Sequence, residues 1–125
     1  MLPSRLARLE QEELRGGLRV LVARTARARL LGLALLSELP VGVGLLLPRC
    51  RSVHTFGMRF ALDLVFIDRH GAVLRMLDGV PAGRVARCRA AEDVLETRVG
   101  EGAVFVRAGA ARLVATGAAR PARRA

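Results

Sequence analysis

The sequence contains no lysine, tryptophan, tyrosine or asparagine, so all 21 of its basic residues are arginine. Arginine codons are rich in G and C, whereas lysine, tyrosine and asparagine codons are rich in A and T, so we attribute the arginine content to a bacterial genome of high G+C content. A net charge of +10 would otherwise indicate nucleic acid as a partner. Because the arginines are scattered along the chain and only 4 phenylalanines could stack on bases, we do not expect nucleic acid as the partner.

Long hydrophobic runs are also missing. The most apolar run, Leu30 to Leu36, is far shorter than the roughly 20 residues that cross a bilayer. The charged first residues lack the apolar stretch of a signal peptide. We therefore expect a soluble, cytoplasmic protein without a membrane partner, in which Cys50 and Cys88 are thiols. Their spacing matches no metal motif, and we predict neither a metal nor a cofactor.

The length of 125 residues suits one domain with terminal additions. Residues 1–17 are predicted to form a polar extension, helical and closed by two glycines. Residues 18–115 form the domain. Residues 116–125 contain mainly alanine, arginine and proline, which predicts a disordered basic tail.

Within the domain, the hydrophobic pattern favours strands over helices. Thr25 caps a predicted helix that runs to about Leu36. A second short helix is predicted within residues 100–109, and residues 81–92 read as a long loop. Strands are predicted at residues 18–23, 43–47, 54–67, 72–80, 93–99 and 111–115. The predicted class is α+β, mostly β, with two short helices.

The stretch HTFGMRFALDLVFIDRHG, residues 54–71, combines apolar and ionisable side chains. Written as a strand, its alternate positions from Phe56 onward form a core face. Arg59 and Asp63 share the other face, where about 13 Å separates them along an extended strand. They can meet only if the chain bends near Gly57. The last four residues, DRHG, predict a hairpin turn that uses the φ > 0 conformation of Gly71.

Four blocks in order resemble the domain-of-unknown-function 192 family, also called uncharacterised protein family 0127: ARTARARLLGLALLSELP, GVGLLLP, HTFGMRFALDLVFIDRHGAVLRM and DVLETRVGEG. The resemblance spans about residues 18–115 and is similar to actinobacterial forms. Two departures are Ala61, where many relatives carry proline, and Phe56-Gly57-Met58-Arg59, where many carry Trp-Met-Lys-Asn. The resemblance implies a compact, mostly β fold with an antiparallel, partly closed, barrel-like sheet. It implies no reaction, because the family has no established activity.

Six residues are candidates to line a pocket beside the HTFGMRFALD segment: Cys50, His54, Arg59, Asp63, Arg84 and Cys88. Asp63 is the strongest, because a carboxylate in an apolar strand must find donors or raise its pKa. The competing interpretation is structural: Asp63 accepts bonds from loop amides or from Arg59 and braces a bend. A second set is expected to be structural, with Phe56 and Met58 in the core: Phe56, Gly57, Met58, Leu62 and Gly71.

Three functions agree with these residues. The preferred one is a non-enzymatic binding or accessory module, monomeric, with a small ligand or a protein as partner and a pocket between the HTFGM segment and residues 81–89. The first alternative is a small enzyme that uses a thiol or carboxylate with His54, which requires Cys50, His54 and Asp63 to converge. The second is a basic binder of nucleic acid or of an acidic surface. No catalytic residue is assigned.

Overall fold

The computed structural model describes residues 2, 4–24 and 39–115. The helix predicted at residues 25–36 and the tail predicted at residues 116–125 lie outside this part of the chain. The described elements, in chain order, are α1 (Ser4–Ala7), β1 (Glu10–Glu13), a 3-10 turn (Arg15–Gly17), β2 (Arg19–Val22), β3 (Val43–Leu47), β4 (Ser52–His54), β5 (Leu62–Ile67), β6 (Val73–Val80), β7 (Val85–Arg87), β8 (Asp93–Arg98), α3 (Gly102–Arg107) and α4 (Ala110–Ala115).

The strands form a six-stranded sheet in the order β1-β2-β3-β8-β5-β6 and a separate two-stranded ribbon, β4–β7. The mostly β class predicted from the sequence is confirmed. The larger sheet is open rather than partly closed, because β1 and β6 are its two edges. It is also mixed rather than antiparallel, since β2 and β3 run parallel. A parallel pair needs a long crossover, and residues 23–42 supply it here.

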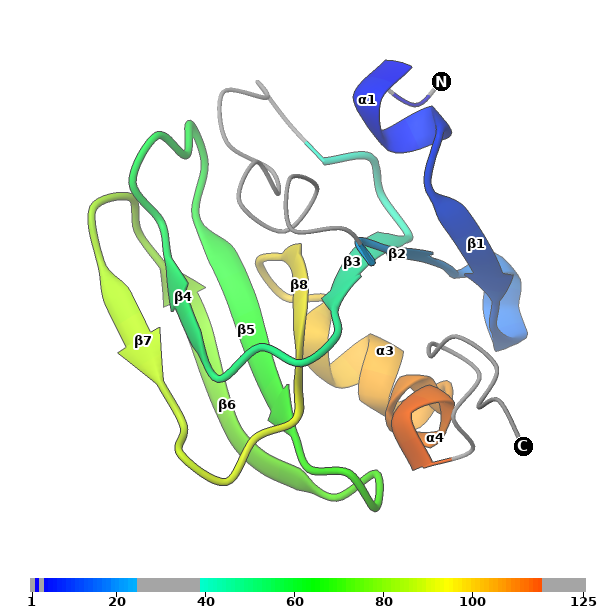
Figure 1. The fold of residues 1–125 in the computed structure, drawn as a ribbon. Coiled ribbons are helices and arrows are strands. Elements are labelled where there is room, and N and C mark those ends of the chain that lie inside the picture. The colour runs from blue at the N-terminus through cyan, green and yellow to red at the C-terminus, as the bar shows by residue number, and fades with distance from the viewer. Residues whose placement is uncertain (1, 3, 25–38, 116–125) are drawn as a thin grey trace.

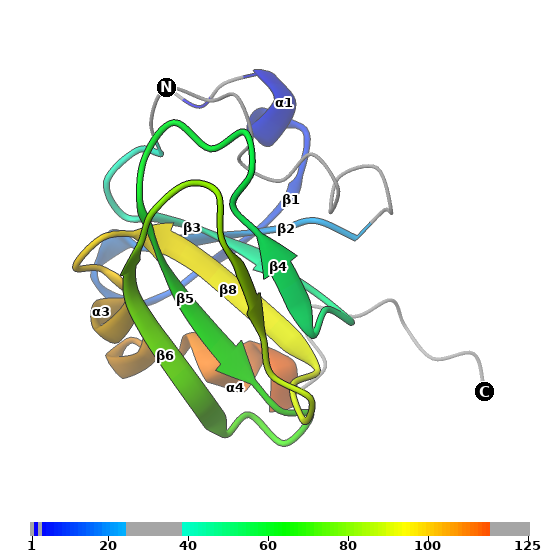
Figure 2. The same ribbon diagram turned by 90° about the vertical axis from the view of Figure 1, so that its left-hand side faces the viewer.

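The six-stranded sheet has a covered layer on each face (Figures 1 and 2). Helices α3 and α4 lie on one face, where Phe105 and Val114 pack with Val65 and Leu95. The β4–β7 ribbon and α1 cover parts of the other face, where a second apolar cluster includes Leu64. Burial on both faces explains why β5 is a nearly continuous apolar run in the sequence, interrupted only by Asp63.

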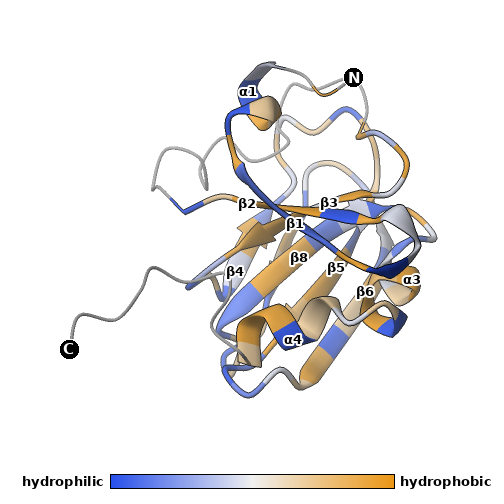
Figure 3. Cartoon of the chain, turned by 90° about the vertical axis from the view of Figure 1, so that its right-hand side faces the viewer, coloured by the Kyte–Doolittle hydropathy of each residue, from blue (hydrophilic) through white to orange (hydrophobic). Residues whose placement is uncertain are grey.

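Two predicted elements are wrong in type. Residues 10–13 form strand β1, which pairs with β2 from Glu10↔Val22 onward, instead of continuing a helix. Backbone pairing with β2 there overrides the helix preference of glutamate and glutamine. Figure 3 shows this edge strand as mostly hydrophilic beside apolar β2 and β3. Residues 111–115 belong to helix α4 rather than a strand, because Ala110, Ala111 and Val114 share one helical face against the sheet.

The predicted strand over residues 54–67 is divided in two by an irregular segment, residues 55–61. Gly57 has φ 81°, so the chain bends at the position where the sequence permitted a bend. The bend turns Phe56 out of the core, with 54% of its surface exposed, so its assignment to the core is wrong. Met58 and Leu62 are buried as predicted.

The hairpin turn between β5 and β6 is confirmed. Asp68 Oδ1 accepts hydrogen bonds from the backbone N–H groups of His70 and Ala72, at 2.8 and 2.9 Å. These bonds lower the pKa of Asp68, with the bond from Ala72 contributing most. Gly71 adopts φ 84°, as the turn requires. The long loop predicted at residues 81–92 contains the short strand β7.

Candidate functional site

Asp63 is a structural brace in this fold. Its side chain is 2% exposed and lies on β5. Oδ1 accepts a hydrogen bond from Gly79 N–H at 2.9 Å, and Oδ2 accepts from Gly100 N–H at 2.9 Å and Gly102 N–H at 3.1 Å. The carboxylate therefore joins β6 and the start of α3 to β5. This arrangement agrees with the structural interpretation of Asp63, in which it accepts hydrogen bonds from backbone amides, rather than with a place in a pocket.

The β6 contact coincides with a bulge. Leu62 pairs with Val80 but Leu64 pairs with Leu77, so β6 has one residue more than β5 in this interval. Gly79 lies in the bulge with φ 61°, a conformation that glycine adopts readily. Asp63 thus satisfies the N–H group that the bulge withdraws from the ladder.

Thr55 connects the two segments between which we predicted a pocket. Its side chain is 1% exposed, and its hydroxyl donates to Pro81 O at 2.7 Å and accepts from Arg84 N–H at 2.8 Å. Thr55 N–H also donates to Arg84 O, and Gly83 N–H donates to Thr55 O. Hydrogen bonds hold these segments together at this point. The sequence-based site selection omitted Thr55, whose only signal was a small polar residue inside an apolar block.

The remaining candidate residues do not form one constellation with Asp63. His54 is exposed on β4, with its ring centroid 5.7 Å from that of Phe56. Arg59 and Arg84 are exposed as well. His54 pairs with Val85, the residue after Arg84, so these two candidates share one end of the β4–β7 ribbon.

Cys50 and Cys88 lie near the other end of the ribbon as half-buried thiols. Cys88 N–H donates to Arg51 O at 2.9 Å, which continues the ribbon's pairing one step beyond Ser52 and Arg87. Cys50 Sγ donates to Ser52 O at 3.2 Å. Both cysteines pack against the apolar cluster beneath the ribbon.

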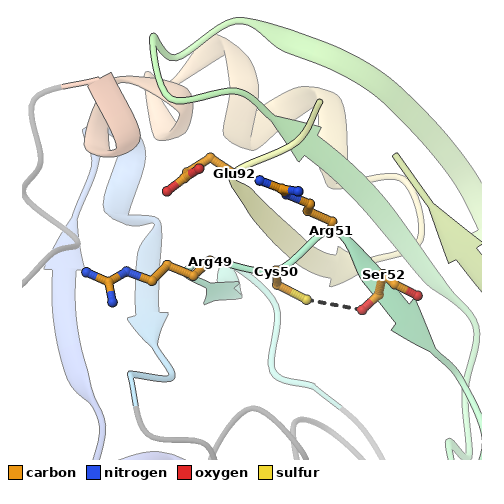
Figure 4. Close-up of a pocket in the computed structure, with 5 residues that line it drawn as sticks. All are labelled: Arg49, Cys50, Arg51, Ser52 and Glu92. Atoms are coloured by element: carbon orange, nitrogen blue, oxygen red, sulfur yellow. Dashed lines mark hydrogen bonds between the residues drawn. The ribbon is translucent and has the colours of Figure 1, made fainter. Parts of the chain in front are cut away.

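A cavity of about 570 Å³ opens beside Cys50, lined by Arg49, Cys50, Arg51, Ser52 and Glu92. We call it the Arg49–Ser52 pocket. Figure 4 shows the Glu92 carboxylate between the two guanidinium groups in this view, with Cys50 below it. Among the sequence-based candidates, only Cys50 lines this pocket. A second cavity, of about 260 Å³, is lined by Leu39, Phe60, Ala61, Arg98 and Val99.

The wall of the Arg49–Ser52 pocket is anchored to the central strands. Cys50 N–H donates to Glu92 O, and Glu92 N–H donates to Ile67 O at the end of β5, both at 2.8 Å. Arg49 N–H donates to Asp93 Oδ1 at 3.3 Å. Arg49 also has φ 54°, the single positive φ at a non-glycine residue in the described chain. Such strained conformations cluster at functional sites, which makes this turn a candidate binding element.

Glu96 is a buried carboxylic acid that the sequence analysis did not single out. It lies on β8 between Leu45 of β3 and Leu64 of β5, and it is 2% exposed. Burial raises its pKa to about 7. Its Oε1 accepts no hydrogen bond within the part of the chain that the structure describes. The only sequence signal was a glutamate at an inward position of a strand.

Two further observations concern the described residues as a set. No three histidine, cysteine, aspartate or glutamate side chains among them are close enough to hold a metal ion. None of the helices in this part of the chain has the length and apolar character to span a membrane.

Comparison with known proteins gives a family and a fold. The sequence model of DUF192, described as Uncharacterized ACR, matches residues 8–111. A Novosphingobium aromaticivorans protein of unknown function is structurally similar, with TM-score 0.60 and 16% identity over 87% of this chain and 93% of that one. A candidate transcription regulator from Sinorhizobium meliloti has TM-score 0.61 and 21% identity over 79% of this chain and 83% of that one. No curated protein matches the chain.

Proposed function

The chain belongs to the DUF192 family, and we propose that it is a binding module for small anionic ligands that uses the Arg49–Ser52 pocket. One observation carries this proposal: Arg49 and Arg51 line the same cavity, on a turn that backbone hydrogen bonds attach to the central strands. Guanidinium groups bind carboxylates and phosphates through paired, charge-assisted hydrogen bonds. The pocket therefore suits a carboxylate or phosphate group on a molecule of metabolite size.

The other lining groups favour a ligand that carries a donor beside its anionic group. Glu92 contributes a carboxylate and Ser52 a hydroxyl. A carboxylate accepts a hydrogen bond from a hydroxyl or an ammonium group, and a serine hydroxyl donates or accepts. A hydroxylated or amino-substituted carboxylate or phosphate ester is thus complementary to the pocket.

The arrangement of the candidate catalytic groups supports binding rather than catalysis. Both oxygens of Asp63 already accept backbone hydrogen bonds. The Cys50 thiol donates to a backbone carbonyl, and His54 packs its ring near Phe56 on the exposed side of the ribbon. A nucleophile needs a base within hydrogen-bond reach, and the described residues supply no such pair among these three.

Calorimetric titration with inorganic phosphate and with citrate tests the proposal. We expect Arg51→Ala to weaken binding about tenfold, because it removes a charge-assisted contact. The matched control is Arg107→Ala, an exposed arginine in the last turn of α3, on the opposite side of the sheet. Failure of both ligands to bind the wild-type protein, or equal affinity in the two variants, would contradict the proposal.

A further inference from the structure

The β4–β7 ribbon concentrates positive charge that is scattered in the sequence. The ribbon and the turns at its ends come from residues 49–60 and 81–91, which contain no aspartate or glutamate; Glu92, the next residue, is the acidic group of the Arg49–Ser52 pocket. The two segments contribute six arginines, all of them exposed: Arg49, Arg51, Arg59, Arg84, Arg87 and Arg89. The strands run antiparallel, so Arg51 and Arg87 lie toward one end of the ribbon and Arg84 toward the other. Figure 2 shows the ribbon lying over the larger sheet, on the side away from α3 and α4.

Exposed apolar surface accompanies the charge at the Arg84 end. Phe56 and Val85 are each 54% exposed, although both are large hydrophobic residues. The rings of Phe56 and His54 form a pair, with centroids 5.7 Å apart and planes tilted by 34°. Val85 lies directly across from His54 in the ribbon. An exposed aromatic pair beside arginines is the composition of a recognition surface rather than of an inert one.

We propose that the outer face of the β4–β7 ribbon binds single-stranded nucleic acid, with a base on the Phe56–His54 ring pair and phosphates on the arginines at the two ends of the ribbon. Such sites combine a positive track for the backbone with aromatic side chains that stack on bases. The exposed ring requires an unpaired base, because the bases of a duplex present only their edges. Arg49 and Arg51 at one end of the ribbon line the Arg49–Ser52 pocket, whereas the ring pair and Arg84 do not, so this proposal extends beyond the small-anion site.

The tertiary arrangement removes the main objection that the sequence raised to a nucleic-acid partner. More than 20 residues of chain separate the arginines of residues 49–60 from those of residues 81–91, yet β4 and β7 pair residue by residue. Charge alone would suit an acidic peptide equally well. The exposed ring pair favours nucleic acid, because base stacking uses it directly.

Fluorescence anisotropy with a labelled 12-nucleotide oligothymidylate tests the proposal. We expect it to bind about tenfold more tightly than the same length of duplex. The logarithm of the binding constant should fall linearly with the logarithm of the salt concentration, by about 0.7 for each phosphate contacted. Arg84→Ala should reduce that slope by about 0.7, whereas Arg107→Ala on α3 should leave it unchanged.

Substitution of the ring separates base recognition from simple charge. Phe56→Ala should weaken oligothymidylate binding about tenfold and leave the binding of a poly-glutamate peptide unchanged. The control is Val104→Ala, an exposed apolar residue of α3. Because both side chains are exposed, thermal melting verifies that each variant folds. Absence of oligothymidylate binding, or binding of poly-glutamate with equal affinity and no effect of Phe56→Ala, would overturn the proposal.

Discussion

Asp63 shows how a single residue acquires its role from three segments. Its two oxygens accept backbone hydrogen bonds from the β6 bulge and from the turn that enters α3. Gly102 is matched to it, since a Cβ there would lie 3.1 Å from Asp63 Cβ and 3.2 Å from Oδ2. The close approach of the Asp63 side chain to the Gly102 backbone explains why glycine occupies this position.

We predict that Asp63→Ala lowers the free energy of unfolding by about 3 kcal/mol, because it leaves three buried or partly buried N–H groups without an acceptor. Urea unfolding at pH 7 measures the change. The matched control is Asp78→Ala, an exposed aspartate on β6. A loss no larger than that of the control would show that Asp63 is not a brace.

At the scale of elements, the β5–β6 hairpin and α4 determine each other's position. A Cβ at Gly71 would lie 2.8 Å from Ala115 Cβ and 2.9 Å from Ala111 O. Glycine is thus required at position 71 for two reasons: its φ of 84°, and its close contact with helix α4.

Comparison with a second glycine separates these two requirements. Gly83 has φ 81°, but a Cβ there would extend into open space, with no atom beyond its chain neighbours within 4 Å. We expect Gly83→Ala to cost about 1 kcal/mol, from backbone strain alone, and Gly71→Ala to cost roughly 3 kcal/mol, from strain and steric overlap. Urea unfolding of both variants gives the comparison. Equal losses would mean that α4 shifts away without cost.

At the scale of the whole molecule, one titrating group in the core links stability to pH. Glu96 lies on the face of the six-stranded sheet that the β4–β7 ribbon and α1 partly cover, beside Leu45 and Leu64 of the apolar cluster there. The described neighbours on the flanking strands are Leu45 and Leu64, and the charged residue next on the same face of β8 is Arg98. Protonated Glu96 fits this apolar cluster, whereas the carboxylate must be desolvated there.

The sign of the pH dependence follows from the raised pKa. Folding raises the pKa of Glu96 from 4.5 to about 7, so the folded state holds more protons between these values. The stability contributed by the protonated acid is present below pH 4.5 and is lost as pH rises through 7. The loss amounts to about 3 kcal/mol. Urea unfolding gives the free energy of unfolding of the wild type and of Glu96→Gln at each pH. We predict that the wild-type value minus the variant value declines between about pH 5 and pH 8. A constant difference across that range would refute it.

Much of the fold could be predicted from local patterns. The strand at Val43–Leu47, the Asp68 turn and the helix after Glu101 agree with the prediction because each depends on neighbouring residues in the chain. Strand β1 and helix α4 were misassigned, since pairing with β2 and packing on the sheet decide their type. The candidate site was harder still, and of its predicted residues only Cys50 lines the Arg49–Ser52 pocket.

The sequence by itself determined the family, the mostly β class and the hairpin turn at residues 68–71, because hydrophobic periodicity and turn residues are local properties. Only the tertiary structure decided that Asp63 is a brace, that Glu96 is buried and that residues 52–54 and 85–87 pair in one ribbon. These outcomes depend on which distant segments pair. A strand's partners and its covering layer are set by long-range packing, which no local pattern specifies.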